Sequence, residues 1–338
     1  MSLLLRRPLL AWGTALALLL AMLVVAFAAG KYPIAPLDLL RALGARLGLA
    51  EAADATIQTV VWQIRMPRVA AGVVVGAVLS AAGAAYQSMF RNPLVSPDIL
   101  GVSAGAGLGA AAAIFLGLSL ALVQVLAFAG GLLAVGTVYL IARLVRRHDP
   151  VLVLVLAGVT VGALLGAGIS LLKILADPYT QLPTITFWLL GGLNAVAADE
   201  LLATLPALLP GLLVLGLLRW RINLLSLGDE EASALGVHVG RLRLVLIAAA
   251  TLGTAAAVSL AGIIGWIGLV VPHIARLLVG PDFSRLLPAS LILGAGFLVG
   301  ADTLARTLAP IELPLGIVTA LVGAPFFLFL LARGGRRE

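Results

Sequence analysis

The sequence contains no cysteine and few charged residues. The absence of cysteine excludes disulfides, thiolate metal sites and cysteine nucleophiles, and it leaves the redox compartment open. Lys, Arg, Asp and Glu make up only 11% of the 338 residues, against about 25% in typical soluble domains. A soluble protein of this length needs a polar surface that so few charges cannot supply. A soluble enzyme, a disordered chain and a nucleic-acid-binding module are therefore excluded.

Long apolar runs are abundant instead. Hydrophobic residues form 62% of the chain, and the mean hydropathy is +1.16. Because a helix needs about 20 apolar residues to cross a bilayer, we predict an all-α integral membrane protein with about ten transmembrane helices, organised as a single domain over residues 1–338. The predicted spans are Leu9–Ala29, Val69–Phe90, Ser103–Leu118, Leu120–Ile141, Val151–Leu175, Glu200–Leu218, Leu242–Leu260, Ile263–Val279, Leu286–Leu304 and Gly316–Leu331.

The placement of Lys and Arg predicts the orientation of these spans. With ten spans both termini share one side, and that side carries 15 of the 22 Lys and Arg residues. The positive-inside rule therefore places both termini in the cytoplasm. The first run exceeds the usual signal-peptide core of about 7–15 residues, so we expect an uncleaved helix. Residues 31–63 then form an external segment, and residues 220–243 form the longest cytoplasmic loop.

Residues for catalysis are scarce. The three histidines lie in different segments, and none is spaced to form a metal site with a neighbouring His, Asp or Glu. We interpret His273, which follows Pro272, as a packed residue at a helix bend. The sequence has no Gly-x-x-x-x-Gly-Lys-Ser/Thr loop for nucleotide phosphates. We therefore expect no ATPase activity, no metal and no cofactor in this chain. If ATP drives the protein, a partner chain binds it.

Three of the five arginines on the predicted external side, where the positive-inside rule disfavours them, are candidates for a binding site. Arg65 and Arg68 flank Pro67, which we expect at the first position of the second span. There they would also face the positive end of the helix dipole. Two unfavourable electrostatic contributions suggest an acidic partner, with lipid phosphate as the alternative. Arg306 follows Asp302 by four residues, a spacing that predicts a local ion pair.

The cytoplasmic loop contains signals for a short helix. Asp229 starts it, Glu230 and Glu231 occupy its first turn, and Gly236 ends it. Ala232 and Leu235 form an apolar face. A short helix between two spans is suited to docking another protein.

Four ordered blocks of sequence resemble the permease subunits of type II ABC importers for iron–siderophores, haem and vitamin B12. The resemblance extends over nearly the whole chain. The blocks comprise Arg65–Arg68 with Gly76, Ala77, Gly83, Gln87 and Arg91–Ala106; Leu224–Gly236; Gly262–Arg276; and Ala301–Arg306 with Glu312–Ala320 and Gly323–Phe327.

The resemblance implies a homodimer with a translocation path at its axis, lined mainly by the fifth span, and alternating access driven by ATP. Two cytoplasmic ATPase subunits, which bind ATP and Mg²⁺, would dock on the loop. An extracytoplasmic substrate-binding protein would dock outside. The residues implied for these contacts are Arg65, Arg68 and Arg306 for the binding protein, and Leu227, Gly228, Asp229, Glu230, Ala232, Leu235 and Gly236 for the ATPase. The implied cytoplasmic gate lies at Asp149 and Pro150.

The expected location is a bacterial-type cytoplasmic membrane. The segment from Ala176 to Gly192 resembles the iron-chelate and molybdate branches more than the B12 branch. We therefore rank a ferric siderophore first, then molybdate or tungstate, haem and cobalamin. An ATP-independent channel or carrier would need ionisable groups at depth or a polar ring in the pore, and a membrane-embedded enzyme would need a catalytic constellation within the spans. We find neither.

Overall fold

The computed structural model describes residues 8–49, 54–145 and 150–334, and within these residues every regular element is helical. The all-α prediction is therefore confirmed. The elements are α2 (Pro8–Ala28), α3 (Pro36–Arg46), α4 (Ala55–Thr59), a π-helical turn η1 (Val60–Arg65), α5 (Met66–Met89), a 3-10 turn η2 (Pro97–Leu100), α6 (Val102–Phe115), α7 (Leu120–Leu144), α8 (Pro150–Leu175), α9 (Gln181–Leu190), α10 (Ala198–Leu224), α11 (Asp229–Ala234), α12 (Val239–Ala261), α13 (Ile267–Val279), α14 (Phe283–Thr307) and α15 (Leu315–Gly334).

Each of the ten predicted spans coincides with one of these helices. Six are long and apolar enough to cross a membrane: α5 with its N-terminal extension, α7, α8, α10, α12 and α14. The described apolar stretches of α2, α6, α13 and α15 are shorter. The number of crossings and the cytoplasmic location of the termini stay predictions.

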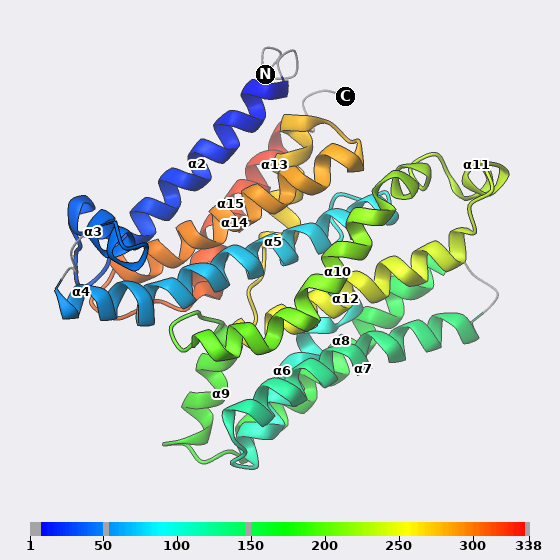
Figure 1. Ribbon diagram of the computed structural model, residues 1–338. Coiled ribbons are helices and arrows are strands. Elements are labelled where there is room, and N and C mark those ends of the chain that lie inside the picture. The colour runs from blue at the N-terminus through cyan, green and yellow to red at the C-terminus, as the bar shows by residue number, and fades with distance from the viewer. Residues whose placement is uncertain (1–7, 50–53, 146–149, 335–338) are drawn as a thin grey trace.

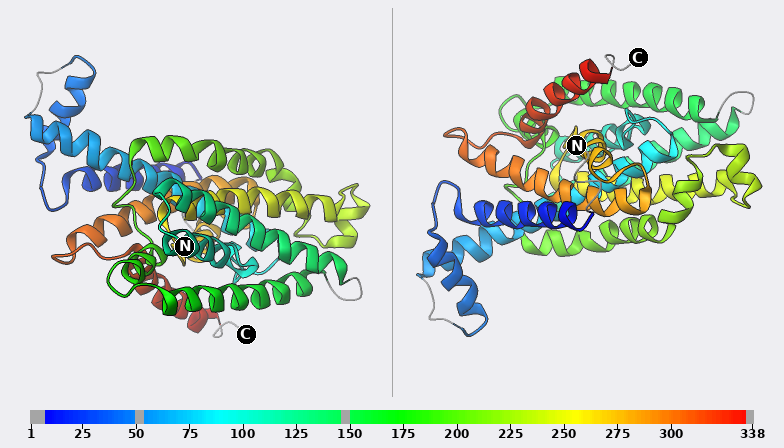
Figure 2. Two further views of the ribbon diagram at one scale, coloured as in Figure 1. Left: turned by 90° about the horizontal axis from the view of Figure 1, so that it is seen from below. Right: turned by 90° about the horizontal axis from the view of Figure 1, so that it is seen from above.

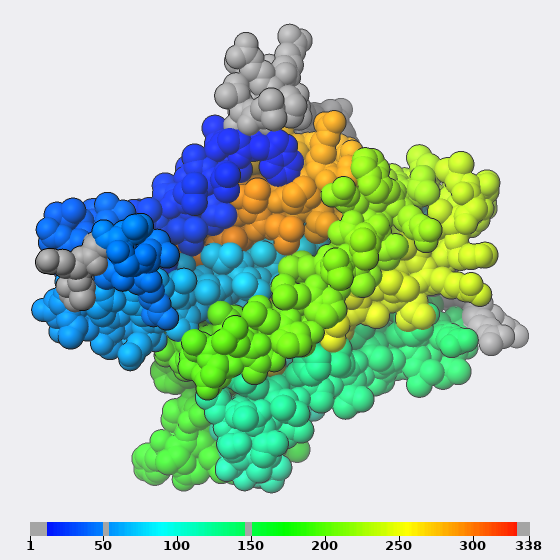
Figure 3. Space-filling model, in the orientation of Figure 1, coloured from blue at the N-terminus to red at the C-terminus, as the bar shows by residue number. Residues whose placement is uncertain are grey.

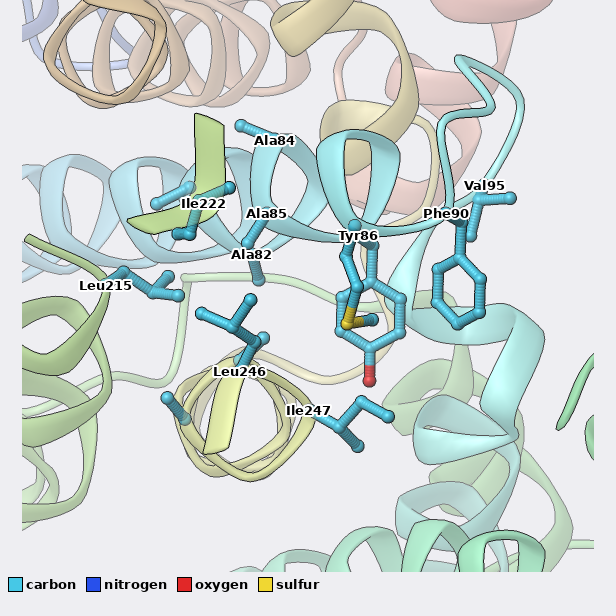
Figure 4. Packing of buried hydrophobic residues seen from close by; sticks show 14 of the residues in the cluster. Ala82, Ala84, Ala85, Tyr86, Phe90, Val95, Leu215, Ile222, Leu246 and Ile247 are labelled. Carbon is cyan, nitrogen blue, oxygen red and sulfur yellow. The ribbon is translucent and has the colours of Figure 1, made fainter. Parts of the chain in front are cut away.

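The helices form one elongated bundle whose two ends differ (Figure 1). The end that carries α3 and α4 corresponds to the predicted external side. The opposite end carries α11. Helix α5 runs through the middle and packs against α14, α12 and α13. In the core Tyr86 of α5 points toward α12, where its hydroxyl lies 3.3 Å from that of Thr251 (Figure 4).

Small residues let α5 and α14 approach closely. A Cβ added to Gly76 would lie 2.3 Å from the carbonyl oxygen of Gly294, a distance that no side chain tolerates. Without a hydrophobic driving force between helices in lipid, such backbone contacts supply much of the packing energy. Gly76 is thus required here by the close approach of the two helices.

The prediction that the second span starts at Pro67 is wrong. The helix begins twelve residues earlier, at Ala55, and runs without a break through the π-helical turn to Met89. Within that turn the Met66 N–H bonds to the Val61 carbonyl, five residues back. Arg65 and Arg68 therefore lie well inside a helix, where they do not face an N-terminal dipole. The argument that the dipole disfavours them does not hold.

Helices α8, α9 and α15 lie along one side of the bundle (Figure 2). Helix α9 was not predicted, because its ten residues are too few for a span. Large apolar side chains on this side are exposed, including Leu164 of α8, Phe187 of α9 and Leu321 of α15. Among the described residues, no element covers them.

Candidate functional site

Three arginines and two carboxylates meet at the end of the bundle that carries α3 and α4. Arg68, on α5, donates from Nε to both carboxylate oxygens of Asp302 on α14, at 2.9 and 3.1 Å. Its Nη1 donates to Glu312 Oε2 at 3.0 Å. Arg306 Nε lies 3.2 Å from Asp302 Oδ2, which confirms the ion pair predicted from the spacing. Asp302 therefore binds two guanidinium groups at once.

Arg65 and Arg306 also hold the end of α2. Arg65 donates to the carbonyl oxygen of Phe27. Arg306 donates to the carbonyl oxygens of Ala26 and Ala29, at 2.9 and 3.2 Å. The last carbonyls of a helix have no partner within that helix, and cations there complement its dipole. The two arginines therefore cap α2 and join it to α5 and α14.

The arginine cluster (Arg65, Arg68, Arg306, Asp302 and Glu312) is largely buried. The three arginines are only 4%, 7% and 6% exposed. The structure brings Arg306 next to Arg65 and Arg68, from which it is far apart in the sequence, but it directs the donors of all three to partners within the chain. The carboxylate of Glu312 and the carbonyls of α2 were not predicted as partners, because no local spacing connects them to the arginines. The proposed role in docking a binding protein stays a prediction.

A cavity of about 490 Å³ lies beside the arginine cluster, among α7, α9, α10, α12 and the start of α15. Arg68 and Glu312 line one side of it, and Glu200, Asn194 and Trp188 are also in its wall. The volume falls within the range of about 300–1,000 Å³ typical of ligand pockets. Arg68 is therefore buried within the bundle and yet borders a cavity that is lined by both polar and apolar side chains.

The opposite end of the bundle carries α11, and the helix predicted there is confirmed (Figure 1). Gly236, at φ +83°, follows its end in the left-handed conformation that glycine favours at this position. Ala232 is fully buried, whereas Leu227 and Leu235 are 55% and 60% exposed. Glu230 is exposed as well. Residues 227–236, hereafter the α11 segment, thus present two leucines and acidic side chains to the surroundings.

Two contacts fix the α11 segment to the bundle. The carboxylate of Asp229 accepts hydrogen bonds from both terminal nitrogens of Arg243 on α12, at 2.8 and 2.7 Å. Such a bidentate pair fixes orientation as well as position. Gly228 has φ +129°, and an added Cβ there would lie 2.3 Å from the Glu231 carboxylate. The segment is therefore held by a charged pair and by a turn that requires glycine.

A third contact joins the same region to α14. The Asn223 side-chain amide, near the end of α10, donates to Asp282 Oδ1 at 2.6 Å. Its oxygen accepts from the Phe283 N–H at 2.7 Å. Asp282 also caps α14 by accepting from the Ser284 N–H and hydroxyl. These hydrogen bonds, led by that from the Ser284 side chain, lower the pKa of Asp282 below its usual value. We call this set the Asn223–Asp282 clamp.

Of the two implied gate residues, the structure describes only the backbone of Pro150. Asp149 lies outside the described residues. Pro150 is the first residue of α8, and its side chain also lies outside them. The gate therefore stays a prediction.

The arrangement defines the class of protein: a multi-pass membrane protein, with a charged cluster at one end of the bundle and a short helix at the other. The model of the FecCD transport family matches residues 18–333, and the chain belongs to that family. It is an ABC importer permease. Permeases of this kind are not themselves ATPases and work with ATPase and binding-protein partners.

Known relatives cover most of the chain. It is 46% identical to the cobalamin import system permease protein BtuC of Halobacterium salinarum, over 82% of this chain and 74% of that protein. It is 43% identical to an iron chelatin transport system permease protein of Helicobacter pylori, over 82% and 84%. Other relatives are named for haemin and molybdate. A solved structure described as an inward-facing metal-chelate type ABC transporter superposes with a TM-score of 0.86, at 35% identity, over 96% of this chain and 99% of that chain.

Proposed function

We propose that the chain is the membrane-spanning subunit of a binding-protein-dependent importer that carries a ferric siderophore into the cytoplasm. Its similarity over nearly full length to a metal-chelate type transporter carries this proposal. The iron chelatin relative supports the same substrate class. Molybdate, haem and cobalamin are the alternatives, because relatives of similar identity are named for each. The proposed location is a bacterial-type cytoplasmic membrane.

We propose that two copies of the chain form the transporter, with the path between them. The support is the apolar side formed by α8, α9 and α15, which no described element covers. Along α8, Leu156, Val159, Leu164 and Leu171 are all more than half exposed. A path lined by such side chains binds a chelate weakly, so the affinity for substrate would come from the binding protein. Alternating access then needs only that the two α8 helices change their separation at each end.

The α11 segment is the proposed ATPase docking site. Leu227 and Leu235 would enter an apolar groove of the partner, and Glu230 would contact its basic rim. Because Arg243 holds Asp229 and Ala232 is buried, motion of the segment is transmitted directly to α12. ATP and Mg²⁺ would bind the partner alone.

Arg65, Arg68 and Arg306 are proposed to attract the binding protein. The arginine cluster holds three positive and two negative side chains, so it keeps one excess positive charge despite its internal pairs. The adjoining cavity gives a partner's carboxylate a place next to Arg68. The attraction would then add to the structural role of the arginines at the end of α2.

The experiment that tests the function is transport by the intact complex. The chain is purified with its ATPase and binding protein from native membranes in mild detergent, and native mass spectrometry gives the stoichiometry and the mass of the bound ligand. The proposal expects two copies of this chain, two ATPase chains and a ferric siderophore on the binding protein. ATP-dependent uptake of that siderophore into proteoliposomes should exceed uptake of haem, cobalamin or molybdate. Purification of the folded chain without an ATPase or a binding protein would contradict the proposed importer complex. A different ligand on the binding protein would contradict the proposed siderophore substrate and would identify the actual one.

A further inference from the structure

A second cavity lies on the bundle away from the sites described so far. It has a volume of about 560 Å³ and is formed by α7, α10 and α12. Its walls are almost entirely apolar, and Gly136 widens it by having no side chain. Figure 3 shows these three helices side by side on one face of the molecule. Because the chain is a multi-pass membrane protein and the proposed interface between copies lies on α8, α9 and α15, this face is expected to meet lipid. We call the cavity the α7–α10–α12 groove.

Each helix lines the groove with a stripe of residues that ends in an exposed arginine. On α7 the stripe passes through Leu132, Val135, Gly136 and Tyr139, and Arg143 follows one turn later. On α12 it passes through Leu252, Ala248, Val245 and Leu244 to Arg241. On α10 it passes through Gly211 and Val214, and Arg221 follows two turns later. Residues three and four apart share a helix face, so all three arginines lie on the groove side of their helices.

The packing contacts place the three arginines at one depth. Gly211 lies opposite Ala249 in the antiparallel pair α10–α12, and Gly131 lies opposite Ala255 in the pair α7–α12. With a rise of about 1.5 Å per residue, Arg221 and Arg241 lie about 15 and 12 Å beyond the first contact. Arg143 and Arg241 lie about 18 and 21 Å beyond the second. The arginines therefore form a basic rim at the predicted cytoplasmic end of the groove.

No ion pair among the described residues involves Arg143, Arg221 or Arg241. All three are exposed. An apolar groove in the hydrocarbon region, with unpaired cations at its headgroup end, matches one class of molecule. Basic pockets between transmembrane helices on the cytoplasmic side bind anionic headgroups. We infer that the α7–α10–α12 groove binds an anionic phospholipid, with an acyl chain between the helices and its phosphate at the basic rim.

The two halves of the site can be altered separately. Gly136 has open space around the position of an added Cβ, so Gly136→Leu adds a side chain to the groove with no contact at its Cβ. Gly13 of α2 is equally open and supplies the control Gly13→Leu. The rim is tested by Arg143→Gln, Arg221→Gln and Arg241→Gln. The control is Arg285→Gln, an exposed arginine at the start of α14.

The full chain is purified in mild detergent, mixed with phosphatidylglycerol and phosphatidylcholine, and weighed intact with its bound lipids. Wild type and both controls should retain one phosphatidylglycerol per chain in preference to phosphatidylcholine. Each rim substitution should lower this preference about fivefold, and Gly136→Leu should abolish retention. Circular dichroism and the thermal midpoint report folding, and only variants that match wild type in both are compared.

Equal retention of the two lipids by wild type would overturn the proposal. So would retention by Gly136→Leu equal to that of wild type. If Gly136→Leu instead dissociated a dimer, the groove would be an interface between copies of the chain. None of these outcomes bears on the transported substrate, so failure here is distinguishable from failure of the proposed function.

Discussion

At the scale of single residues, the arginine cluster has the strongest energetic consequences. Asp302 pairs with Arg68 and Arg306 and is only 2% exposed. Removal of one partner from a buried ion pair leaves a charge without compensation. The pairing of α5 with α14 at this end of the bundle therefore depends on one carboxylate.

Asp302→Asn should lower the free energy of unfolding by about 3–5 kcal/mol. Glu312→Gln should cost clearly less, because the Glu312 side chain is 32% exposed and water can replace it. Thermal unfolding of both variants in the same detergent measures the difference. Equal losses of unfolding free energy in the two variants would show that Asp302 contributes no more to stability than Glu312 does.

The proposed docking role of the arginines predicts an effect on binding of the substrate-binding protein, in addition to the effect on stability. Arg65→Glu with Arg68→Glu should weaken binding of the substrate-binding protein by more than about tenfold, or about 1.4 kcal/mol. Arg41 and Arg46 of α3 are exposed at the same end, and their reversal to Glu is the matched control. Since the cluster also joins helices, binding is compared only for variants that remain folded. Loss of binding in the α3 control alone would assign docking to α3.

Single helices were predictable from sequence where their signals are local. The bounds of α11 follow from Asp229 and Gly236, which are close in sequence. The Asp302–Arg306 pair follows from a spacing of four residues. By contrast, the bond from Arg68 to Asp302 spans 234 residues, and no local pattern encodes it. The start of α4 was missed because Pro67 is typical of a first helical position, whereas here the helix continues through a π-helical turn.

At the scale of single helices, the first prediction concerns the α11 segment. Leu235→Asp should reduce copurification of the ATPase and ATPase stimulation, with a loss of about 2 kcal/mol or more typical of an apolar anchor. Folding should not change, since Leu235 is exposed. Leu47→Asp, at an exposed leucine next to α3, is the control at the opposite end. Normal ATPase stimulation by Leu235→Asp would refute the docking role.

The Asn223–Asp282 clamp predicts a dependence on pH. The pKa of Asp282 in the folded protein is lowered below its unfolded value, about 3.9. Its contribution is therefore fully present above that unfolded pKa and is lost as the pH falls through the lower folded pKa. Asp282→Ala should cost about 1 kcal/mol at neutral pH, as expected for a helix cap.

Hydrogen exchange at the first turn of α14 measures this contribution. In wild type the protection should decrease under acid, whereas Asp282→Asn should show no such change from this site. Identical acid profiles in the two proteins would contradict the assignment.

At the scale of the whole molecule, the main feature is the apolar side formed by α8, α9 and α15, which stays exposed among the described residues of a single chain. The family relationship makes the permease role clear, but it assigns no substrate, since relatives at similar identity are named for different cargo. In the proposed path, the side chains of α8 that would meet the cargo are apolar and interchangeable. The sequence therefore predicts the architecture far better than the substrate.

The homodimer can be tested with single cysteines, because the chain contains none. Leu164→Cys on α8 should form a disulfide with the same residue of a second copy under mild oxidation. Leu16→Cys on α2, which is 49% exposed, should remain monomeric. Non-reducing electrophoresis of membranes gives the readout. A crosslink at Leu16 without one at Leu164 would place the interface on the other side of the bundle.

The uninterrupted helix from Ala55 to Met89 has a mechanical consequence. Its 35 residues are about 52 Å long, whereas the hydrocarbon core of a bilayer is about 30 Å thick. A helix that exceeds the hydrocarbon thickness tilts or projects beyond the lipid. Because the close approach at Gly76 fixes α5 against α14, a load placed on the tip near α3 would be transmitted to the core of the bundle.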